Sequence, residues 1–425
     1  MLDMKLIRDH PEVVADNLKR RGNTEKVRML QDLIEYDKKW RQLLTEANEL
    51  RHKRRMITNE IASLKKKGKD AGEKIQEAQA IPEKIKKLGM QVEEYKQKAN
   101  QILLKLPNIL DESVPVGKDE TENVVIRTCG KPPDFDFEPK NHLEVALRLG
   151  LIDVERGAKV AGHGFYYLRG ELALLDYAIL CYTIDFMIKR GYQLVEPPFM
   201  MRKRPYLGVT DLEFFEDQLY KIAREDLYLI ATAEHPIAAY FMDEVLAKKD
   251  LPVKFVGVSS CFRKEVGAHG KYTRGLFRMH QFNKVEQFIF CLPEDSRKFH
   301  EELQKNAEDL YQSLGLHHRV VVLCSGDTGI VQAKTYDIQV WMADGEYREI
   351  GSNSNCTDYQ ARRLNIRHRE KEGQAPAGFV HTINNTALAT SRTMMAILEH
   401  FQQRDGSIVI PKVLRPFMGG RERIG

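Results

Sequence analysis

Several features that would indicate a secreted protein, a membrane protein or a zinc protein are missing from this sequence. The 425 residues contain no run that approaches the roughly 20 apolar residues of a membrane span, and the opening stretch MLDMKLIRDHPEVV lacks the apolar core of a signal peptide. The six cysteines stand singly, without a CxxC pair or a His/Cys cluster at zinc-ligand spacing. We therefore expect a cytoplasmic protein that does not bind a membrane, has no disulfide framework, and buries its cysteines as small core residues.

The composition indicates the class of protein but not its partner. Hydrophobic residues make up 42% of the chain and charged residues 30%, as in a globular protein that is somewhat rich in charge. The length is large for one domain and usual for two. The formal net charge of +5 is only mildly basic, so it is weak evidence for nucleic-acid binding unless the charge is concentrated in one region.

Two long heptad patterns follow a short helical segment at the N-terminus. Apolar residues alternate at spacings of four and three from Met29 to Leu64, interrupted only by Arg54, and again from Ala78 to Leu106. The intervening stretch is rich in Lys and Gly, which predicts an antiparallel helical hairpin. Each helix would have about 30 residues and a length of about 45 Å. Pro82 indicates either a first helical turn or a kink, and the pattern does not decide between them.

This predicted arm, residues 27–104, carries the basic excess of the chain. It contains 18 Lys and Arg against 12 Asp and Glu, a net charge of +6, whereas the whole chain carries +5. A charged coiled coil is most often a solvated rod. Basic residues gathered at its tip and outer face would also suit a phosphate backbone that is bound without reading the bases.

The stretch 107–139 contains five prolines near acidic residues and glycines and shows no sustained period, which predicts a linker. The sequence therefore divides into an N-terminal domain at 1–106, the linker at 107–139 and a larger domain at 140–425.

The stretch 259–286 has apolar strand-like ends around a loop rich in Gly, His, Lys and Arg, which predicts an antiparallel hairpin with a basic tip. Charged and polar residues recur on its strands where a buried sheet would be apolar, namely Arg263, Glu265, Arg278, Gln281, Lys284 and Glu286. A solvated hairpin would show the same alternation. The other interpretation is a polar floor for a charged substrate.

Three further segments place polar side chains at element ends. Thr232 and Glu234 follow an apolar strand and would share its face, or else Thr232 caps a helix whose first turn holds Glu234. Strands at 334–341 and 347–355, joined by a turn, would bring Glu349 and Ser352 together at a bend, and such hard oxygen ligands suit Mg²⁺. Arg392 lies on an apolar helix, where it needs either an anionic ligand or a structural ion pair.

These segments resemble the three motifs of class II aminoacyl-tRNA synthetases, in the form seen in seryl-tRNA synthetases. Residues 262–265 with 278–286 resemble motif 2, and 384–399 resemble motif 3, although Ala387 and Ser391 replace glycines found in many relatives. The helix 170–189 with the strand that ends at Pro198 resembles motif 1, although by itself Pro198 only ends a strand. The resemblance implies an α+β protein, with an antiparallel-sheet class II catalytic core and an N-terminal antiparallel α-helical coiled-coil arm.

The resemblance also assigns site residues. It implies that the serine pocket is formed by Thr232, Ala233, Glu234, Arg263, Glu286, Asn384 and Thr386. It implies that ATP is bound by Arg263, Lys264, Glu265, Met279, Phe282, Glu349, Ile350, Gly351, Ser352 and Arg392, with Mg²⁺ held by Glu349 and Ser352. The catalytic residues would be Arg263, Glu265 and Arg392, with Phe282 and Arg392 enclosing the adenine ring and Arg392 also holding the γ-phosphate.

The reaction implied is the activation of L-serine by ATP to seryl-adenylate, then transfer of serine to the 3′-terminal adenosine of tRNA(Ser), which the arm would hold. Whether tRNA(Sec) is also charged is left open, and a homodimer built through motif 1 is expected. Two rival hypotheses are a non-catalytic RNA-binding scaffold and an enzyme that loads serine onto a carrier protein. The retained charged residues disfavour the scaffold, and the long arm disfavours the carrier-protein enzyme, whose relatives lack it.

Overall fold

The computed structural model describes residues 1–265 and 276–425, apart from the side chains of residues 213 and 214. The chain divides into two compact units, one formed by residues 2–106 and the other by Met1 with residues 107–425. In the described part of the chain, no helix combines the length and the apolar character that crossing a membrane requires. All six cysteines are free; four are buried, but Cys181 is exposed, so the expectation that every cysteine is buried is wrong.

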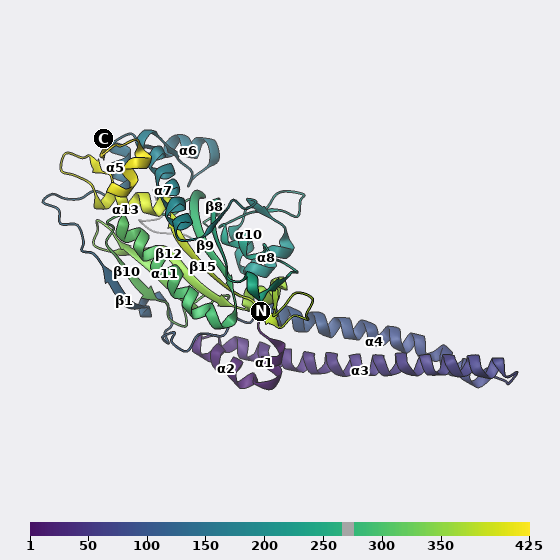
Figure 1. The fold of residues 1–425 in the computed structure, drawn as a ribbon. Coiled ribbons are helices and arrows are strands. Elements are labelled where there is room, and N and C mark those ends of the chain that lie inside the picture. The colour runs from purple at the N-terminus through teal and green to yellow at the C-terminus, as the bar shows by residue number, and fades with distance from the viewer. Residues whose placement is uncertain (266–275) are drawn as a thin grey trace. The chain divides into compact units, whose positions relative to one another are not determined.

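The N-terminal unit is helical and contains the predicted antiparallel hairpin (Figure 1). Its helices are α1 (Met4–Asp9), α2 (Pro11–Arg20), α3 (Thr24–Lys66) and α4 (Gly72–Lys105). The two long helices have 43 and 34 residues, so both exceed the predicted length. Pro82 lies inside α4, well past its first turn, which excludes the first-turn interpretation.

Packing between α3 and α4 follows the heptad seams. Leu33, Leu43, Ala47 and Ile57 are buried on α3, as are Ile81 and Ala99 on α4. The rings of Tyr36 and Tyr95 pack with centroids 5.9 Å apart. Ion pairs cross between the helices near the tip, from Lys53 to Glu77 at 2.7 Å and from Lys74 to Glu60 at 2.9 Å. Exposed pairs of this kind contribute little to stability, so the apolar seam holds the hairpin together.

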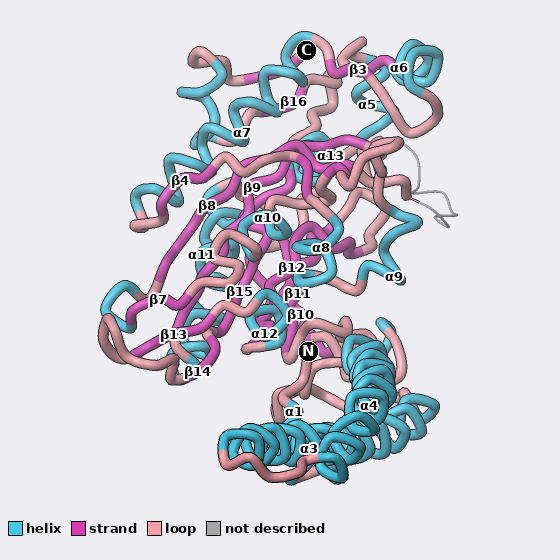
Figure 2. Tube along the Cα trace, turned by 90° about the vertical axis from the view of Figure 1, so that its right-hand side faces the viewer, coloured by secondary structure: helices cyan, strands magenta, loops and turns pink. Residues whose placement is uncertain are grey.

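The larger unit contains an eight-stranded sheet (Figure 2). The strand order is β1 (Val124–Cys129), β10 (His318–Val322), β11 (Lys334–Trp341), β12 (Tyr347–Thr357), β15 (His381–Ala389), β9 (Gln281–Cys291), β8 (Val253–Phe262) and β4 (Gln193–Val195). Neighbouring strands are antiparallel except for the parallel pair β4 and β8. This confirms the predicted fold class, an α+β protein with an antiparallel-dominated sheet and long N-terminal helices.

Helices and short strands surround this sheet. The helices are α5 (His142–Arg148), α6 (Val154–Ala161), α7 (Gly170–Lys189), α8 (Lys203–Val209), α9 (Leu212–Phe215), α10 (Glu234–Ala238), α11 (Ser296–Ser313), α12 (Tyr359–Leu364) and α13 (Thr390–His400). Short 3₁₀ helices are η1 (Glu120–Glu122), η2 (Glu216–Gln218), η3 (Lys248–Asp250), η5 (Pro293–Asp295) and η6 (Lys412–Met418). The short strands are β2 (Ile152–Asp153), β3 (Tyr167–Leu168), β5 (Met200–Met201), β6 (Tyr228–Leu229), β7 (Val245–Ala247), β13 (Arg367–Arg369), β14 (Gly378–Phe379), β16 (Ile408–Val409) and β17 (Arg423–Ile424).

Side chains of β9 point alternately into two hydrophobic cores, one on each face of the sheet. Val285 and Ile289 pack against Leu303 of α11, whereas Phe288 and Phe290 lie in the other core, with residues of α8, α10 and α12. Burial of each of these aromatic side chains contributes about 1.5–3 kcal/mol. Because successive side chains of a strand point to opposite faces, Glu286 and Lys284, two and four positions before Phe288, share its face.

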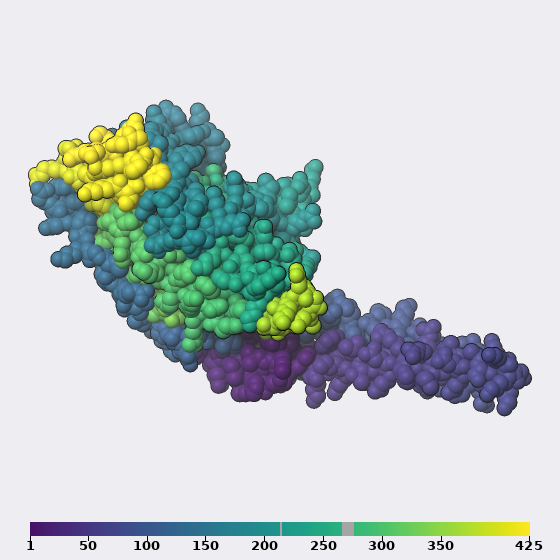
Figure 3. Space-filling view, in the orientation of Figure 1, coloured from purple at the N-terminus to yellow at the C-terminus, as the bar shows by residue number. Residues whose placement is uncertain are grey.

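The C-terminal segment packs against the helix α7 beside the sheet. Residues near the C-terminus, yellow in Figure 3, lie beside the blue segment that contains α7. The contact includes the rings of Tyr182 on α7 and Phe417 on η6, whose centroids are 6.1 Å apart. The end of the chain therefore belongs to the core of the larger unit.

Two local predictions are confirmed and one range differs from its prediction. The predicted hairpin around residues 259–286 is formed by β8 and β9, with Cys261 opposite Phe282, and its predicted tip loop lies outside the described residues. The predicted pair of strands ending in the turn at 343–346 is formed by β11 and β12. The stretch predicted as a linker contains β1, which pairs with β10 at the sheet edge. Its run Val124–Ile126 is strand-forming, but the prolines on either side hid that signal.

Candidate active site

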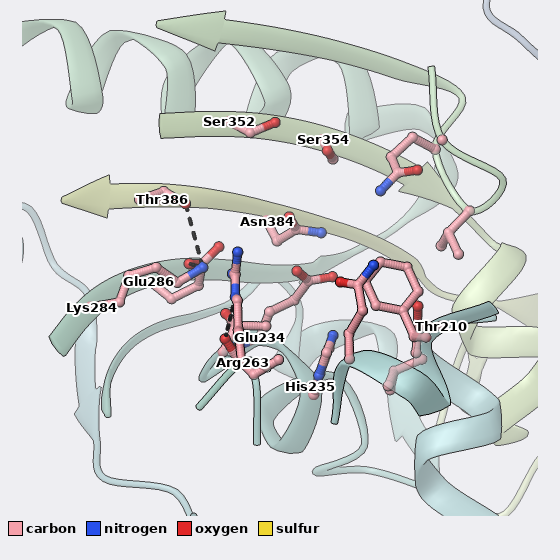
Figure 4. A pocket seen from close by; sticks show the side chains of 18 of the residues that line it. Thr210, Glu234, His235, Arg263, Lys284, Glu286, Ser352, Ser354, Asn384 and Thr386 are labelled. Atoms are coloured by element: carbon pink, nitrogen blue, oxygen red, sulfur yellow. Dashed lines mark hydrogen bonds and ion pairs between the residues drawn. The ribbon is translucent and has the colours of Figure 1, made fainter. Parts of the chain in front are cut away.

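A pocket of about 360 Å³ opens over the face of the sheet that carries Glu286 (Figure 4). Strands β9, β15 and β12 supply its floor, and α10 with the end of β8 supplies a wall. Among the residues that line it are the predicted Thr232, Glu234, Arg263, Glu286, Ser352, Asn384 and Thr386. The fold thus gathers side chains that are more than 150 positions apart in the sequence.

Thr232 and Glu234 reach this pocket from a helix start. Strand β6 ends at Leu229 and α10 begins at Glu234, so the expectation that both side chains extend from one strand face is wrong. Glu234 lies in the first turn, as the helix-start alternative predicts, but the N-cap is Ala233 rather than Thr232. The hydroxyl of Thr232 accepts a hydrogen bond from the backbone N–H of Glu234 at 3.2 Å, which is compatible with a pocket role because a hydroxyl has further hydrogen-bonding capacity.

Two carboxylates face this pocket, Glu286 fully buried and Glu234 half-buried. Burial, together with the negative charge of Glu286, raises the pKa of Glu234 to about 7. Burial also raises the pKa of Glu286, while the ammonium of Lys284 opposes that rise. Gln360 donates to Oε1 of Glu234 at 3.3 Å. A pocket with two carboxylates and nearby cations is suited to a small ligand that carries both an ammonium and a carboxylate.

A second pocket, of about 50 Å³, adjoins the first. Its lining includes the predicted Arg263, Glu265, Met279, Phe282, Ile350 and Arg392. Arg263, Lys284 and Thr386 line both pockets, so the two pockets meet at these three side chains. Arg263 also donates from Nε to the carbonyl oxygen of Ala231 at 3.3 Å, which fixes its guanidinium at the junction.

Aromatic rings and guanidinium groups pair in this second pocket. The guanidinium carbon of Arg263 lies 5.2 Å from the ring centroid of Phe282. The guanidinium carbon of Arg392 lies 4.9 Å from the ring centroid of Phe277, a residue that the sequence did not single out. The two pairs provide flat cationic and aromatic surfaces of the kind that stack on a planar ring.

Glu265 lies beyond the strand rather than on it. Strand β8 ends at Phe262, and Glu265 has a backbone φ of 49°, in the left-handed region. The expectation that Arg263, Glu265 and Arg278 lie on the strands of the hairpin is therefore wrong, because β8 ends before the first two and β9 begins after the third. Oε2 of Glu265 accepts from Arg278 at 3.2 Å. A non-glycine residue in this region is strained by about 1 kcal/mol or more.

Glu349 and Ser352 share a face because of a β-bulge. Glu349 pairs with Gln339 and Gly351 with Ile338, which leaves Ile350 as an extra residue on β12. On a regular strand, two side chains three positions apart point to opposite faces. The extra residue shifts the alternation by one, so Glu349 and Ser352 point to the same face. The bend that the sequence predicted here is this bulge.

Asp337 adds a third oxygen-bearing side chain to this region. It pairs with Ser352 across the sheet, and its Oδ1 is buried without a hydrogen-bond partner among the described residues. Burial, and then the charge of Glu349, raises the pKa of Asp337 well above its ordinary value. In contrast, the guanidinium of Arg392, 3.1 Å from Oε1 of Glu349, lowers the pKa of Glu349.

These donors fit a hard cation that shares ligands with phosphates. Carboxylate and hydroxyl oxygens suit Mg²⁺, which usually takes only one or two protein carboxylates and completes its shell with water and phosphate oxygens. Within the described ranges, no group of three or more His, Cys, Asp or Glu side chains is arranged to hold a metal ion by itself. The site therefore fits a metal that arrives with a phosphate-bearing ligand.

Four predicted residues line neither of the two pockets in the described structure. Ala233 is fully buried, and Lys264 lies 5.9 Å from the ring centroid of Tyr220. Glu349 instead pairs with Arg392 at the edge of the second pocket, and Gly351, on β12, lies against the backbone of Thr386. The sequence also left Lys284, Phe277 and Asp337 without roles; only Lys284 carried a signal, as a charge on a strand that is otherwise apolar.

The comparisons with known proteins cover the whole chain. Residues 1–110 match the family described as "Seryl-tRNA synthetase N-terminal domain", and residues 218–401 match "tRNA synthetase class II core domain (G, H, P, S and T)". The serine–tRNA ligase of Methanocella arvoryzae is 51% identical over 423 residues, which is 99% of this chain and 100% of that protein.

Solved structures agree over the same length. The crystal structure of seryl-tRNA synthetase from Pyrococcus horikoshii complexed with ATP superposes with a TM-score of 0.95 at 46% identity, covering 100% of this chain and 99% of that one. The cytoplasmic serine–tRNA ligase of Naegleria fowleri in complex with AMP gives a TM-score of 0.88 at 37% identity, with 100% and 98% coverage.

Proposed function

The chain belongs to the seryl-tRNA synthetase family, and on this premise we propose that it is a serine–tRNA ligase with its active site at the two joined pockets. L-serine and ATP react to give seryl-adenylate and pyrophosphate, and serine is then transferred to the 3′-terminal adenosine of tRNA(Ser). The observation that carries this proposal is the junction at Arg263, where a pocket with two carboxylates meets a pocket whose aromatic rings pair with guanidinium groups.

The larger pocket binds serine. The carboxylate of Glu234 attracts the serine ammonium, and Glu286 with Thr386 hydrogen-bonds the serine hydroxyl. Alanine or glycine would leave these buried groups unpaired, a mismatch that can discriminate by roughly 10⁴-fold. Threonine must be rejected by size, because its extra methyl group needs room beside Glu286 and Thr386.

The first chemical step needs positioning rather than a nucleophilic side chain. The serine carboxylate is already an anion, so the protein must hold it against the α-phosphate and neutralise the charge that develops there. Arg263 lies between the two pockets and can donate to both partners with its planar guanidinium.

The smaller pocket binds ATP. Phe282 supports the adenine ring from one side, and Glu265 accepts from its amino group. Arg392 covers the other side and reaches the γ-phosphate. Glu349 and Ser352 would hold Mg²⁺, which would neutralise phosphate charge. The Arg392–Glu349 contact at 3.1 Å places the guanidinium assigned to the γ-phosphate beside one of these two residues.

The coiled-coil arm holds tRNA(Ser) by its phosphate backbone. Its net charge of +6 supports this role, as does the run of lysines at its tip, Lys65 to Lys69. In this proposal, residues 1–106 are the tRNA-binding domain, 107–139 connect it, and 140–425 form the catalytic domain. The enzyme works in the cytoplasm, and charging of tRNA(Sec) is left open.

The catalytic domain forms a homodimer through the motif 1 segment. The helix α7 exposes Tyr177 and Ile188 by 66% and 49%, and the edge strand β4 exposes Leu194 by 45%. An exposed edge strand with neighbouring apolar side chains is a surface that usually becomes covered. Analytical ultracentrifugation of the wild type and of Y177E would test this, because a charge at the interface should shift the protein toward the monomer.

The experiment that tests the activity is ATP–pyrophosphate exchange with each amino acid in the absence of tRNA. Serine alone should support exchange, and R263A should lower the rate by at least about 10³-fold through loss of contacts to the carboxylate and α-phosphate. R404A is the matched control, because Arg404 is exposed and lines neither pocket. A folded protein that gives no exchange with any amino acid would overturn the proposal and favour the RNA-binding scaffold.

Charging of tRNA(Ser) tests the arm separately. Replacing Lys65, Lys66, Lys67 and Lys69 with Glu should leave pyrophosphate exchange unchanged and lower the charging rate at least about tenfold. The loss should shrink as salt concentration rises, because binding of a phosphate backbone depends on released counterions. Equal charging by both proteins at low salt would mean that the arm tip does not bind the tRNA.

A further inference from the structure

Lys284 is a buried cation to which the reaction described above gives no role. Its side chain is only 7% exposed, and it extends from β9 on the same face as Glu286 (Figure 4). Burying an ammonium is costly unless it is paired, so its presence here needs a reason. The residue also lines both pockets, which no purely structural ion pair would require.

The contacts of Lys284 point at the groups that would recognise serine. Its Nζ lies 2.5 Å from Oε2 of Glu286 and donates to Oγ1 of Thr386 at 3.5 Å. These are the two residues to which serine selection is assigned. An ammonium has three N–H donors, so these two acceptors leave one donor for a ligand at the junction of the pockets.

Glu286 would be a poor acceptor without this partner. Glu234 lies in the same pocket, and two like charges in a buried site favour protonation of one of them. A protonated Glu286 would present a donor where an acceptor for the hydroxyl is needed, and its carboxyl would be free to rotate. Arg263, at the end of β8, faces the same space but points to the junction.

We propose that Lys284 is a positioning residue for serine selection, which keeps the Glu286 carboxylate charged and oriented so that it accepts a hydrogen bond from the serine hydroxyl. This inference rests on the proposed function and deepens it. Among the described residues, Oε2 of Glu286 has no hydrogen bond of regular geometry besides its ion pair. The carboxylate therefore keeps capacity for a ligand, and Lys284 holds it in place.

The alternative is that Lys284 only balances the charge of Glu286 and so stabilises the fold. The two roles differ in what they predict for amino acids that lack the hydroxyl. A counter-ion that only stabilises the fold affects activation of serine and alanine alike. A residue that orients Glu286 affects serine strongly and alanine weakly, because alanine makes no use of the Glu286 acceptor.

The test compares pyrophosphate exchange with serine and with alanine in the wild type and in K284M, which keeps the chain length without the charge. The ratio of kcat/KM for serine to that for alanine should fall by about 30- to 100-fold, with the KM for serine raised and the KM for ATP changed less than about threefold. K284R restores a charge and should recover part of the ratio. If K284M does not fold, K284Q replaces it.

Lys254 offers a matched control. It lies on the neighbouring strand β8 and forms a half-buried ion pair with Glu302 at 2.7 Å, outside both pockets. K254M should leave the serine-to-alanine ratio unchanged. In addition, E286Q alone should already abolish the preference for serine over alanine. Adding K284M to E286Q should therefore lower the serine-to-alanine ratio little further.

The outcomes separate this inference from the function on which it rests. No serine-dependent exchange by the wild type would overturn both. An active wild type with an unchanged ratio in K284M, or with serine and alanine activation lowered equally, would overturn the role of Lys284 alone. A further loss of the ratio in the double variant, as large as in K284M, would also overturn it, because Lys284 would then act independently of Glu286.

Discussion

Two buried glutamates in the larger unit, Glu286 in the pocket and Glu399 on α13, have opposite surroundings. Glu399 is fully buried, and Oε1 accepts from the backbone N–H and from Nδ1 of His142 at 2.9 and 2.7 Å. Oε2 accepts from the backbone N–H of Ala343 at 2.9 Å. Glu286 is just as buried but relies on Lys284 and keeps an oxygen without a regular hydrogen bond among the described residues.

The difference separates a carboxylate that joins elements from one that awaits a ligand. Glu399 connects α13 with α5 and with the turn after β11, and it uses both oxygens to do so. Both oxygens of Glu399 already accept hydrogen bonds from other elements, which is what a structural carboxylate needs. Burial of the charge alone therefore does not distinguish the two glutamates, whereas their hydrogen bonding does.

Neutralising the pocket glutamate should have the largest effect on activity. We expect E286Q to lower kcat/KM for serine by roughly 10³- to 10⁴-fold, because the amide replaces the hydroxyl's charged acceptor with a weaker, misoriented one. The free energy of unfolding should fall in E286Q, because Lys284 is left buried without its counter-ion, and it should fall less in the E286Q/K284M double variant, which removes both charges of the pair. Exchange kinetics and urea unfolding of the same preparations measure the two quantities, and a large stability loss in the double variant would remove the contrast with Glu399.

Truncating the saturated glutamate should do the reverse. E399A leaves three N–H donors buried without an acceptor, and we expect the free energy of unfolding to fall by about 3–5 kcal/mol. Once folded, the variant should keep kcat for serine activation within about tenfold of the wild type. Thermal and urea unfolding give the stability. A stable E399A with lost serine affinity would show that Glu399 belongs to the binding machinery instead.

The sequence distinguishes these two glutamates only in part. Glu286 could be assigned a role because it lies on a strand with several polar residues, within a recognisable motif. Glu399 ends the motif 3 segment, but its partners come from α5 and from the turn after β11, which are about 260 and 60 positions away. Contacts of that range are set by the three-dimensional packing and leave no local period in the sequence.

The same reasoning explains which parts of the fold were predictable. The α3–α4 hairpin follows from a local repeat, and the β8–β9 pair follows from two strand-like runs close in sequence. The strand β1 pairs with β10 almost 200 positions later, and it escaped prediction within a proline-rich stretch. The left-handed Glu265 and the extra residue at Ile350 depend on the partner strands, which the residue types alone do not reveal.

An intermediate effect is expected at His142, which connects the Glu399 cluster with the smaller pocket through Leu276 and Phe277. Its Nε2 accepts from the backbone N–H of Leu276 at 3.3 Å, and the next residue, Phe277, lies under Arg392. We expect H142A to raise the KM for ATP about tenfold, with a smaller change in the KM for serine, because the ring under Arg392 loses its anchor. Steady-state exchange at varied ATP measures this. Equal changes in both constants would mean that the cluster acts on the whole site.

The smallest predicted effect is a pH dependence in which serine binding weakens while the stability of the protein increases. Burial and the charge of Glu286 raise the pKa of Glu234 to about 7, whereas burial lowers the pKa of His235 to about 3, so His235 stays neutral in this range. Below about pH 7 Glu234 becomes protonated and loses its attraction for the serine ammonium, so the KM for serine should rise by up to about tenfold per pH unit. The folded state then binds a proton that the unfolded chain binds only near its ordinary, lower pKa, so stability should increase as the pH falls from 7 toward 5. As the pH falls from 8 to 5.5, exchange kinetics should therefore show weaker serine binding, and urea unfolding should show a larger free energy of unfolding. A KM for serine that does not change with pH would mean that Glu234 does not bind the amino group.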